Sequence, residues 1–147
     1  MIERRIEVLD EVIERCKAIL GETSVSIILF GSLARGLQDN RSDIDLLIVV
    51  NKDITGDFLK DIRIGILLKY SVNLDIICMS KQDVIDNFEY FSPLFISFVL
   101  GVSILVDVDF FEKEYFKFLN QLKEENIKYV EQGKIWDLQE ISSKILQ

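Results

Sequence analysis

Two aspartates on one predicted strand are the residues of this chain best placed to do chemistry. Asp43 and Asp45 are separated by one residue and stand directly before the apolar run 46–50. In an extended strand such residues face the same side, about 6.6 Å apart at a rise of ~3.3 Å per residue. From there both carboxylates can converge on divalent metal ions, as metal-assisted phosphoryl chemistry requires. The apolar run predicts a buried central strand with acids at its start.

A glycine–serine pair precedes these acids. Residues 25–30 form a β-branched, apolar run that stops at Gly31 and Ser32, which predicts a strand turning into a short helix. Backbone N–H groups at such a turn can bind a phosphate, and glycine leaves room for its approach. Ser32 adds a hydroxyl group.

A third acid, Asp75, lies in another predicted strand, residues 72–79. On its own it is also consistent with a charge at the edge of a sheet. The same alternative applies to Asp43 and Asp45, because acidic pairs recur by chance in an acidic protein. The combination of glycine–serine, the paired acids, the buried strand and the third acid favours a functional site.

These residues resemble the nucleotidyltransferase superfamily that includes DNA polymerase beta, most closely its minimal nucleotidyltransferase (MNT) branch. The family pattern is glycine–serine, a spacer, Asp-x-Asp on one strand and a third Asp on a neighbouring strand, and here the resemblance covers roughly residues 20–110. It implies an α/β (α+β) fold: a small mixed sheet with flanking helices and a helical C-terminus. We expect one domain over residues 1–147, with C-terminal helices from about residue 109.

The resemblance also implies an activity, the transfer of AMP from ATP to a hydroxyl group. Asp43 and Asp45 would hold two Mg²⁺ ions, or Mn²⁺, one of them shared with Asp75, which would act on the acceptor side. Gly31 and Ser32 would bind the triphosphate. Arg35 is open to two interpretations, a phosphate contact or an ion pair that closes the turn at Gly36.

The acceptor is not specified by the chain. Larger family members carry a second domain for the acceptor, and this chain has no residues left for one. The resemblance therefore implies a partner, a HEPN-domain toxin that would be modified on a tyrosine by its MNT antitoxin. Two alternatives stay open: a stand-alone enzyme for a small, antibiotic-like molecule with its acceptor site across a homodimer, and a non-catalytic antitoxin that acts by contact alone.

Composition excludes several other classes of function. The net charge of −8 and the pI near 4.6 argue against broad binding to nucleic acid. The absence of histidine excludes Ser-His-Asp triads and zinc–histidine sites. Cys16 and Cys78 fall on apolar faces without metal-ligand spacing, so we expect free thiols in a reducing cytoplasm.

The remaining elements follow from periodicity and capping signals. The N-terminus shows no cleavable signal and predicts an amphipathic helix that ends at Gly21. We expect a polar turn over residues 53–57, a helix after it, a capping box at Ser80 and Asp83, and a short helix begun by Ser92 and Pro93. The inward stripe of the N-terminal helix is predicted to be Ile2, Ile6, Leu9, Ile13, Cys16 and Leu20.

The apolar segment 91–106 is too short and too interrupted to cross a membrane. Beyond it we expect a strand over residues 103–106, then a helix with Phe111, Tyr115, Phe118 and Leu122 on one stripe. Gly133 would separate this helix from a last helix bearing Ile135, Leu138, Ile141 and Ile145. A stripe of this kind normally belongs to the core, although the mean hydropathy of +0.23 would also suit a surface that binds a second copy or a partner.

Overall fold

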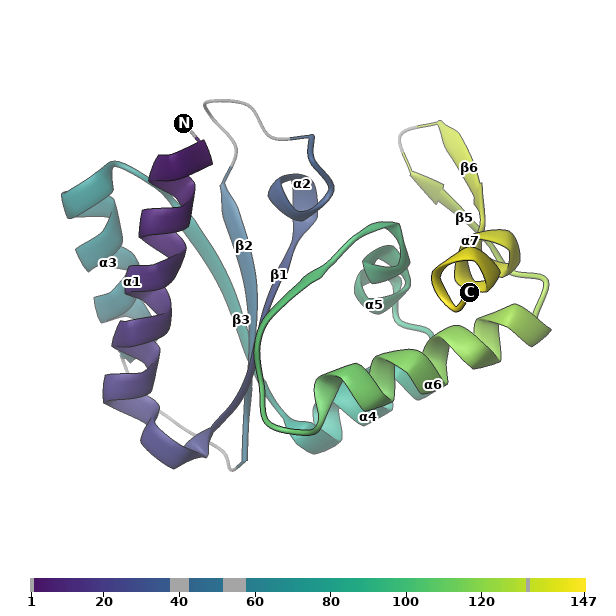
Figure 1. The fold of residues 1–147 in the computed structure, drawn as a ribbon, viewed down its shortest axis with the longest axis horizontal. Helices are drawn as coiled ribbons and strands as arrows, with labels where there is room; N and C mark the ends of the chain where they lie inside the picture. The colour runs from purple at the N-terminus through teal and green to yellow at the C-terminus, as the bar shows by residue number, and fades with distance from the viewer. Residues whose placement is uncertain (1, 38–42, 52–57, 132) are drawn as a thin grey trace.

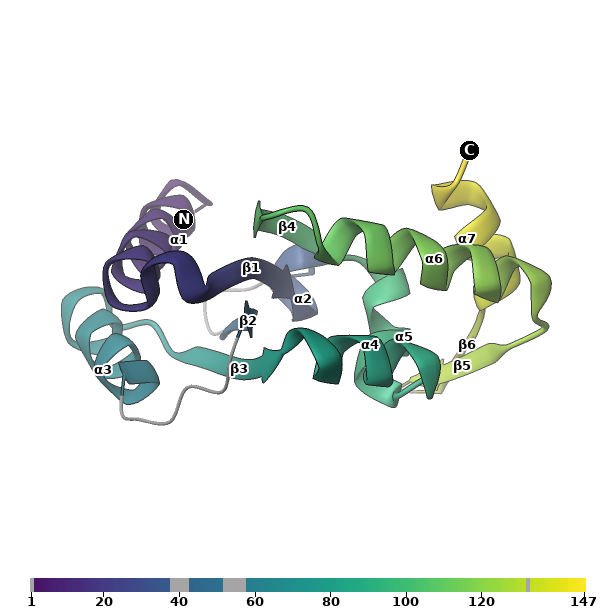
Figure 2. The ribbon, with the colours of Figure 1, turned by 90° about the horizontal axis from the view of Figure 1, so that it is seen from below.

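The chain folds into a four-stranded sheet with helices on both faces and a separate two-stranded hairpin (Figures 1 and 2). The computed structural model describes residues 2–37, 43–51, 58–131 and 133–147. The helices are α1 (Ile2–Leu20), α2 (Gly31–Ala34), α3 (Phe58–Tyr70), α4 (Lys81–Glu89), α5 (Pro93–Ser97), α6 (Phe111–Glu124) and α7 (Leu138–Ile145). The strands are β1 (Ser24–Phe30), β2 (Ile44–Val50), β3 (Leu74–Ser80), β4 (Ser103–Asp107), β5 (Lys128–Glu131) and β6 (Lys134–Asp137), with 3₁₀ turns at Gly21–Thr23 and Phe98–Leu100.

The main sheet is mixed, with the order β3-β2-β1-β4. Strand β1 runs antiparallel to both β2 and β4, whereas β2 and β3 are parallel. Strand β2 therefore lies inside the sheet, and all of its residues except Asp45 are buried. This confirms the predicted buried central strand with an acid at its start.

Side chains from the two faces of the sheet belong to two separate apolar clusters. Leu46 and Ile48 of β2 pack with α1 and α3, and Leu47 and Val49 pack with the helices α4 to α7. Figure 2 shows this division, with α1 and α3 at one side of the sheet and α4 to α7 at the other. A strand covered on both faces has no polar face, which explains its continuous run of apolar residues.

Two predicted helix starts are confirmed. Ser80 and Asp83 form a capping box at α4, because each side chain pairs with the backbone N–H of the other residue. At α5, the Ser92 hydroxyl accepts a hydrogen bond from the N–H of Phe95, and Pro93 occupies the first helical position.

Helix α6 begins at an acid on the preceding strand. The Asp107 carboxylate accepts hydrogen bonds from the N–H groups of Phe111 and Glu112, at 2.9 and 3.0 Å. It also accepts one from the hydroxyl of Ser26, a buried residue of β1, at 2.6 Å. This acid therefore joins the start of the helix to the central part of the sheet.

Two expectations about helices are wrong. The buried residues of α1 are Val8, Val12, Cys16 and Leu20, while the Ile6 side chain is 53% exposed. Ile6 lies two positions from Val8, about 200° around the helix, and so faces away from the sheet. Cys16 and Leu20 of the predicted stripe are confirmed as core, and Leu9 and Ile13 pack against it, so the stripe is wrong at Ile6 and lacks two buried valines.

The second correction concerns the C-terminus. Residues 128–131 and 134–137 form the paired strands β5 and β6 instead of helix, so Ile135 lies on a strand and is 69% exposed. Gly133 has a positive φ of 78°, which suits a turn and ends the helical pattern. The helix predicted after it is confirmed only from Leu138 onward.

Several smaller predictions can also be compared with the structure. The aromatic stripe of α6 is core, because Phe111, Tyr115 and Phe118 are all buried. Cys16 and Cys78 are free thiols, and burial raises the pKa of Cys16 to about 11. No helix within the described residues is long and apolar enough to cross a membrane. The turn predicted over residues 53–57 lies outside the described residues.

Candidate functional site

The acids singled out in the sequence lie at the end of the sheet where β2 and β3 begin. In the parallel register of these strands, Asp45 is paired with Asp75. The backbone N–H of Ile44 donates to the carbonyl of Asn73 at 3.0 Å, which ties the two strand starts together. Residues paired in this way point to the same face of a sheet. Asp45 and Asp75 are therefore neighbours on one face.

That face is the one covered by the C-terminal helices. Asp45 points to the same face of β2 as Leu47 and Val49, which pack against α4 to α7. Asp43, two residues earlier, is exposed, as is Asp75, whereas Asp45 is half-buried. The site is thus at the rim of the larger aromatic cluster and open to solvent on its outer side.

Ionisation of all three acids at the same time is unfavourable. Burial raises the pKa of the Asp45 carboxyl above its usual value, and the negative charges of Asp75 and Asp43 raise it further. No Lys or Arg among the described residues forms an ion pair with these carboxylates. Carboxylate oxygens are the ligands that Mg²⁺ and Mn²⁺ prefer in proteins.

The three carboxylates are not collected around one point. Across the described parts of the chain, no three His, Cys, Asp or Glu side chains form a group that could hold a metal ion as they stand. The chemistry of the donor set fits a divalent cation, and the arrangement consists of the paired Asp45 and Asp75 with the more exposed Asp43 beside them.

Gly31 lies against the Asp45 carboxylate. It begins α2 directly after Phe30, the residue of β1 that pairs with Asp45. A Cβ atom built on Gly31 would lie 2.1 Å from Oδ2 of Asp45, and the φ angle of +75° disfavours any L side chain there. Only glycine allows this turn to approach the acid so closely, and Ser32 follows it as the second residue of α2.

Arg35 is turned toward the C-terminal hairpin. Its guanidinium forms an ion pair with Glu131 of β5 at 2.9 Å, and the two side chains are only 17% and 32% exposed. Gly101 permits this placement, because a Cβ there would lie 3.1 Å from Cγ of Arg35. Of the two interpretations given to Arg35, an ion pair is present, but its partner lies on the hairpin and not at the Gly36 turn.

The hairpin brings residues to this region that were not expected from the sequence. Arg35, Glu131, Lys134 and Trp136 line a cavity of about 230 Å³ together with Leu37 and Leu100. Figure 1 shows α2 and the hairpin both on the upper side of the view, with the hairpin farther to the right. The sequence signal for this strand pair was a set of aromatic and β-branched residues on both sides of Gly133, namely Tyr129, Val130, Ile135 and Trp136.

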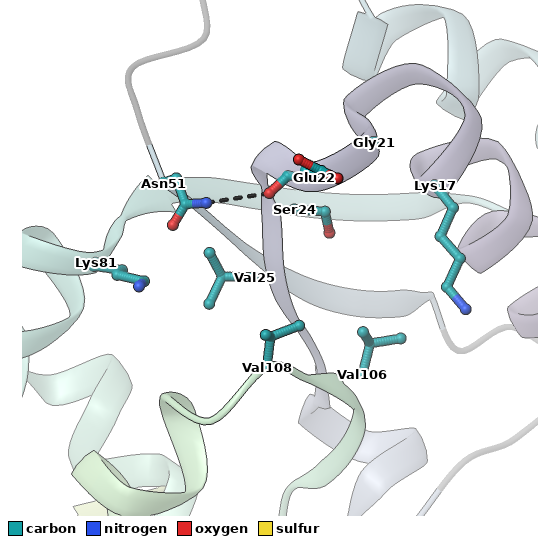
Figure 3. A pocket seen from close by; sticks show the side chains of 9 residues that line it. All are labelled: Lys17, Gly21, Glu22, Ser24, Val25, Asn51, Lys81, Val106 and Val108. Carbon is teal, nitrogen blue, oxygen red and sulfur yellow. Dashed lines mark hydrogen bonds between the residues drawn. The ribbon is translucent and has the colours of Figure 1, made fainter.

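A larger cavity, of about 430 Å³, lies at the opposite end of the sheet (Figure 3). It is bordered by the first residues of β1, by Asn51 after β2 and by Lys81 at the start of α4. None of the predicted site residues lines it. The larger cavity is therefore separate from the candidate site.

Comparisons with known proteins identify the family of the chain. The model of the family described as "Nucleotidyltransferase domain" matches residues 9–146. A Methanocaldococcus jannaschii protein named "Putative protein adenylyltransferase MJ1305" is 29% identical over 140 residues, which cover 91% of this chain and 94% of that protein. A second protein of that organism, MJ0604, bears the same type of name and is 46% identical over 56 residues, covering 38% of this chain and 54% of that protein.

Solved structures share the fold at low sequence identity. A toxin–antitoxin structure with AMP-PNP has a TM-score of 0.51 and 16% identity, and the match covers 76% of this chain and 84% of that one. A tri-AMPylated Shewanella oneidensis HEPN toxin in complex with its MNT antitoxin gives a TM-score of 0.51 at 14% identity, covering 80% of this chain and 85% of that one. The predicted mixed α/β fold is confirmed. Since the family model spans nearly the whole chain, this protein belongs to the nucleotidyltransferase domain family.

Proposed function

We propose that this protein transfers AMP from ATP to a hydroxyl group on a partner protein, a tyrosine of a HEPN-domain toxin. The observation that carries the proposal is the set of three acids at one end of the sheet, with Gly31 in contact with the central one. The adenylyltransferase name of the relative that matches 91% of the chain supports it. The fold shared with structures of HEPN–MNT pairs supports the choice of partner.

Asp43 and Asp45 would hold the divalent cations, and Asp75 would share one of them. A bound Mg²⁺ or Mn²⁺ would supply charge neutralisation at the reacting phosphate and a lowered pKa for the attacking hydroxyl. The mutual repulsion of the acids, which raises the pKa of Asp45, is relieved when a cation is bound. The repulsion among the ionised acids therefore favours the binding of a cation.

The other residues would position the donor nucleotide. The Asp45 carboxylate occupies the position that a side chain at residue 31 would fill, so Gly31 lets the turn lie against this acid. The backbone N–H groups of the turn at Gly31 would bind the phosphates. Ser32 would donate a hydrogen bond from its hydroxyl group to the triphosphate. An oxygen of the acceptor would form a bond to the α-phosphorus, the bond from that phosphorus to pyrophosphate would break, and Asp75 would accept the acceptor's proton.

The test is a transfer assay with a purified HEPN-domain toxin as the acceptor, which we expect to be encoded beside the present chain. Incubation with ATP and Mg²⁺ should add about 329 Da per AMP to that protein, the mass fixed by adenylyl transfer to a hydroxyl. EDTA and the Asp75→Asn variant should abolish the added mass, while Asp75→Asn should leave ATP binding largely in place. Asp10, exposed on α1, provides the matched control Asp10→Asn, which should retain full transfer.

Two results would favour the alternatives. Silencing of the toxin without any added mass would identify an antitoxin that acts by contact alone. Modification of a small hydroxyl compound, with no product on the HEPN protein, would identify a stand-alone enzyme for small molecules. Equal ATP affinity with and without EDTA, measured by calorimetry, would contradict the role of the cations.

A further inference from the structure

The cavity beneath the C-terminal hairpin has the shape and chemistry of a site for a flat ring. Its lining combines the Trp136 indole and two leucines with the charged side chains of Arg35, Glu131 and Lys134. With a volume of about 230 Å³ it can admit a ring system but not a folded peptide segment. Aromatic and aliphatic walls of this kind bind the faces of heterocyclic bases by stacking.

Trp136 is held against the core. Its side chain packs on the aromatic cluster, and its indole Nε1 is buried. The ring therefore presents carbon atoms, and not its N–H group, to the cavity. A ring held in this way offers a surface for stacking that is already in position before a ligand binds.

The cavity is close to the site of the acids. Arg35, on its wall, follows Gly31 by four residues, about one helical turn or ~6 Å along the axis of α2. The N–H of Arg35 donates to the carbonyl of Gly31 at 3.2 Å. A nucleotide with its phosphates at Gly31 would therefore have its base within reach of the cavity.

The position of the hairpin over α2 is fixed by an ion pair. Arg35 and Glu131 are 2.9 Å apart and both are mostly shielded from solvent, which makes the pair stronger than an exposed one. The backbone at Gly101 closes in behind Arg35. The cavity is thus held by two separate parts of the chain, α2 and the hairpin, before any ligand arrives.

We propose that this cavity holds the base of the donor nucleotide, stacked on the indole ring of Trp136. This inference rests on the proposed function, because it takes the phosphates to lie at Gly31. It makes Trp136 a nucleotide-binding residue and assigns the hairpin β5–β6 a direct part in donor selection. Arg35 then acts mainly by holding the hairpin in place.

The chain offers its own reporter, because Trp136 is its only tryptophan. Addition of ATP with Mg²⁺ to the full-length protein should quench the tryptophan emission with a midpoint that matches the Kd from calorimetry. Tripolyphosphate with Mg²⁺, which lacks a base, should bind without changing the emission. Quenching by tripolyphosphate to the same extent would contradict a site for the base.

Variants test the same point without fluorescence. Trp136→Ala should weaken ATP binding about tenfold, the cost of losing one base-stacking contact, and leave the affinity for tripolyphosphate unchanged. Trp136→Phe keeps a smaller ring for stacking and for packing, so its loss of affinity should be smaller than that of Trp136→Ala and its fold should be retained. Tyr90, an aromatic residue 81% exposed at the end of α4, gives the control Tyr90→Ala, which should bind ATP normally.

The outcomes separate this inference from the proposed function. ATP binding by calorimetry with unchanged emission and a normal Kd for Trp136→Ala would overturn the base site and leave the transfer reaction standing. Absence of ATP binding by calorimetry would overturn both. Quenching by the HEPN partner but not by ATP would assign the cavity to the acceptor side chain and overturn the base site.

Discussion

Replacing Asp45 with asparagine is expected to stabilise the protein when no divalent cation is present. The Asp45 carboxylate is half-buried and lies on the same face of the sheet as Asp75, its register partner. Its pKa is raised by burial and by the charges of Asp75 and Asp43, so its ionised form is unfavourable in the folded state. Asparagine has nearly the same shape and carries no charge.

The size of the effect follows from the spacing of the strands. Paired residues on adjacent strands are about 5 Å apart, and two unit charges at that distance in a water-like dielectric repel by about 0.8 kcal/mol. The solvent exposure of Asp75 justifies the high dielectric. For a chain of 147 residues, a gain of this size raises Tm by about 2–4 °C.

The gain depends on pH in a defined direction. Because the pKa of Asp45 is higher in the folded than in the unfolded chain, the folded state binds more protons, and its stability falls as pH rises through that interval. The advantage of Asp45→Asn should therefore be complete at neutral pH and vanish below about pH 4, the usual value for an unfolded aspartate. Added salt should reduce the part that comes from Asp75 and Asp43.

Thermal melts in EDTA at neutral pH and at pH 4 measure these effects, with Asp10→Asn as the control for the loss of one exposed charge. Addition of Mg²⁺ should raise the Tm of the wild type more than that of Asp45→Asn. A lower Tm for Asp45→Asn in EDTA would refute the reasoning, because it would mean that the carboxylate stabilises the folded chain.

Three further predictions concern the contacts around the site. Gly31→Val should lower both Tm and nucleotide binding far more than Ser32→Ala, because it places a side chain at a φ of +75° and within 2.1 Å of the Asp45 carboxylate. Thermal melts and calorimetry measure these two effects. Full ATP binding by the valine variant would mean that the triphosphate lies elsewhere. Asp107→Ala should cost about 2 kcal/mol at neutral pH by urea unfolding, because it removes the acceptor for Ser26 and for two N–H groups of α6. Burial alone would raise the pKa of Asp107, but these hydrogen bonds lower it overall, so the cost should be present above about pH 4 and be lost as pH falls; a cost independent of pH would contradict the assignment. A double-mutant cycle of Arg35→Gln and Glu131→Gln should give a coupling of about 0.5–1 kcal/mol in unfolding experiments, and strictly additive losses would mean that the ion pair does not hold the hairpin.

The sequence predicted the central part of the fold well because the relevant signals are local. A short apolar run without polar alternation, rich in β-branched residues and bounded by polar segments, favours a strand covered on both faces, and β2 has that burial. The capping box at Ser80 and Asp83 and the start of α5 at Ser92 depend on side chains within three residues of each other. The glycine–serine turn also follows from its immediate neighbours.

The errors arose where partners distant in the chain decide the structure. The face of α1 that packs on the sheet is set by α3 and the sheet, which the sequence of α1 alone does not specify. The hairpin was missed because Ile135 fits a helical spacing with Leu138 as well as a strand. Short apolar patterns allow both interpretations, and Gly133 with its positive φ was interpreted as a helix break instead of a hairpin turn.

The site itself was predictable only as a set of residues. The roles of Asp43, Asp45, Asp75, Gly31 and Ser32 remain predictions, although the structure brings Asp45 into contact range of Gly31 and beside Asp75. The distance between the acids depends on which strands are neighbours, and nothing local in the chain determines that β2 pairs with β3. Arg35 shows the same limit, because its partner is 96 residues away.

The register of the sheet explains how these acids can be held in place without contributing to the core. Leu46 and Leu47 point to opposite faces of β2 and enter different apolar clusters. A slip of one residue would exchange their faces and put a carboxylate into the core, which is why burial on both sides fixes the register. The same register pairs Asp45 with Asp75. The geometry of the candidate site is therefore set by leucines that take no part in its chemistry, so that substitutions of the acids can change activity while the fold is retained.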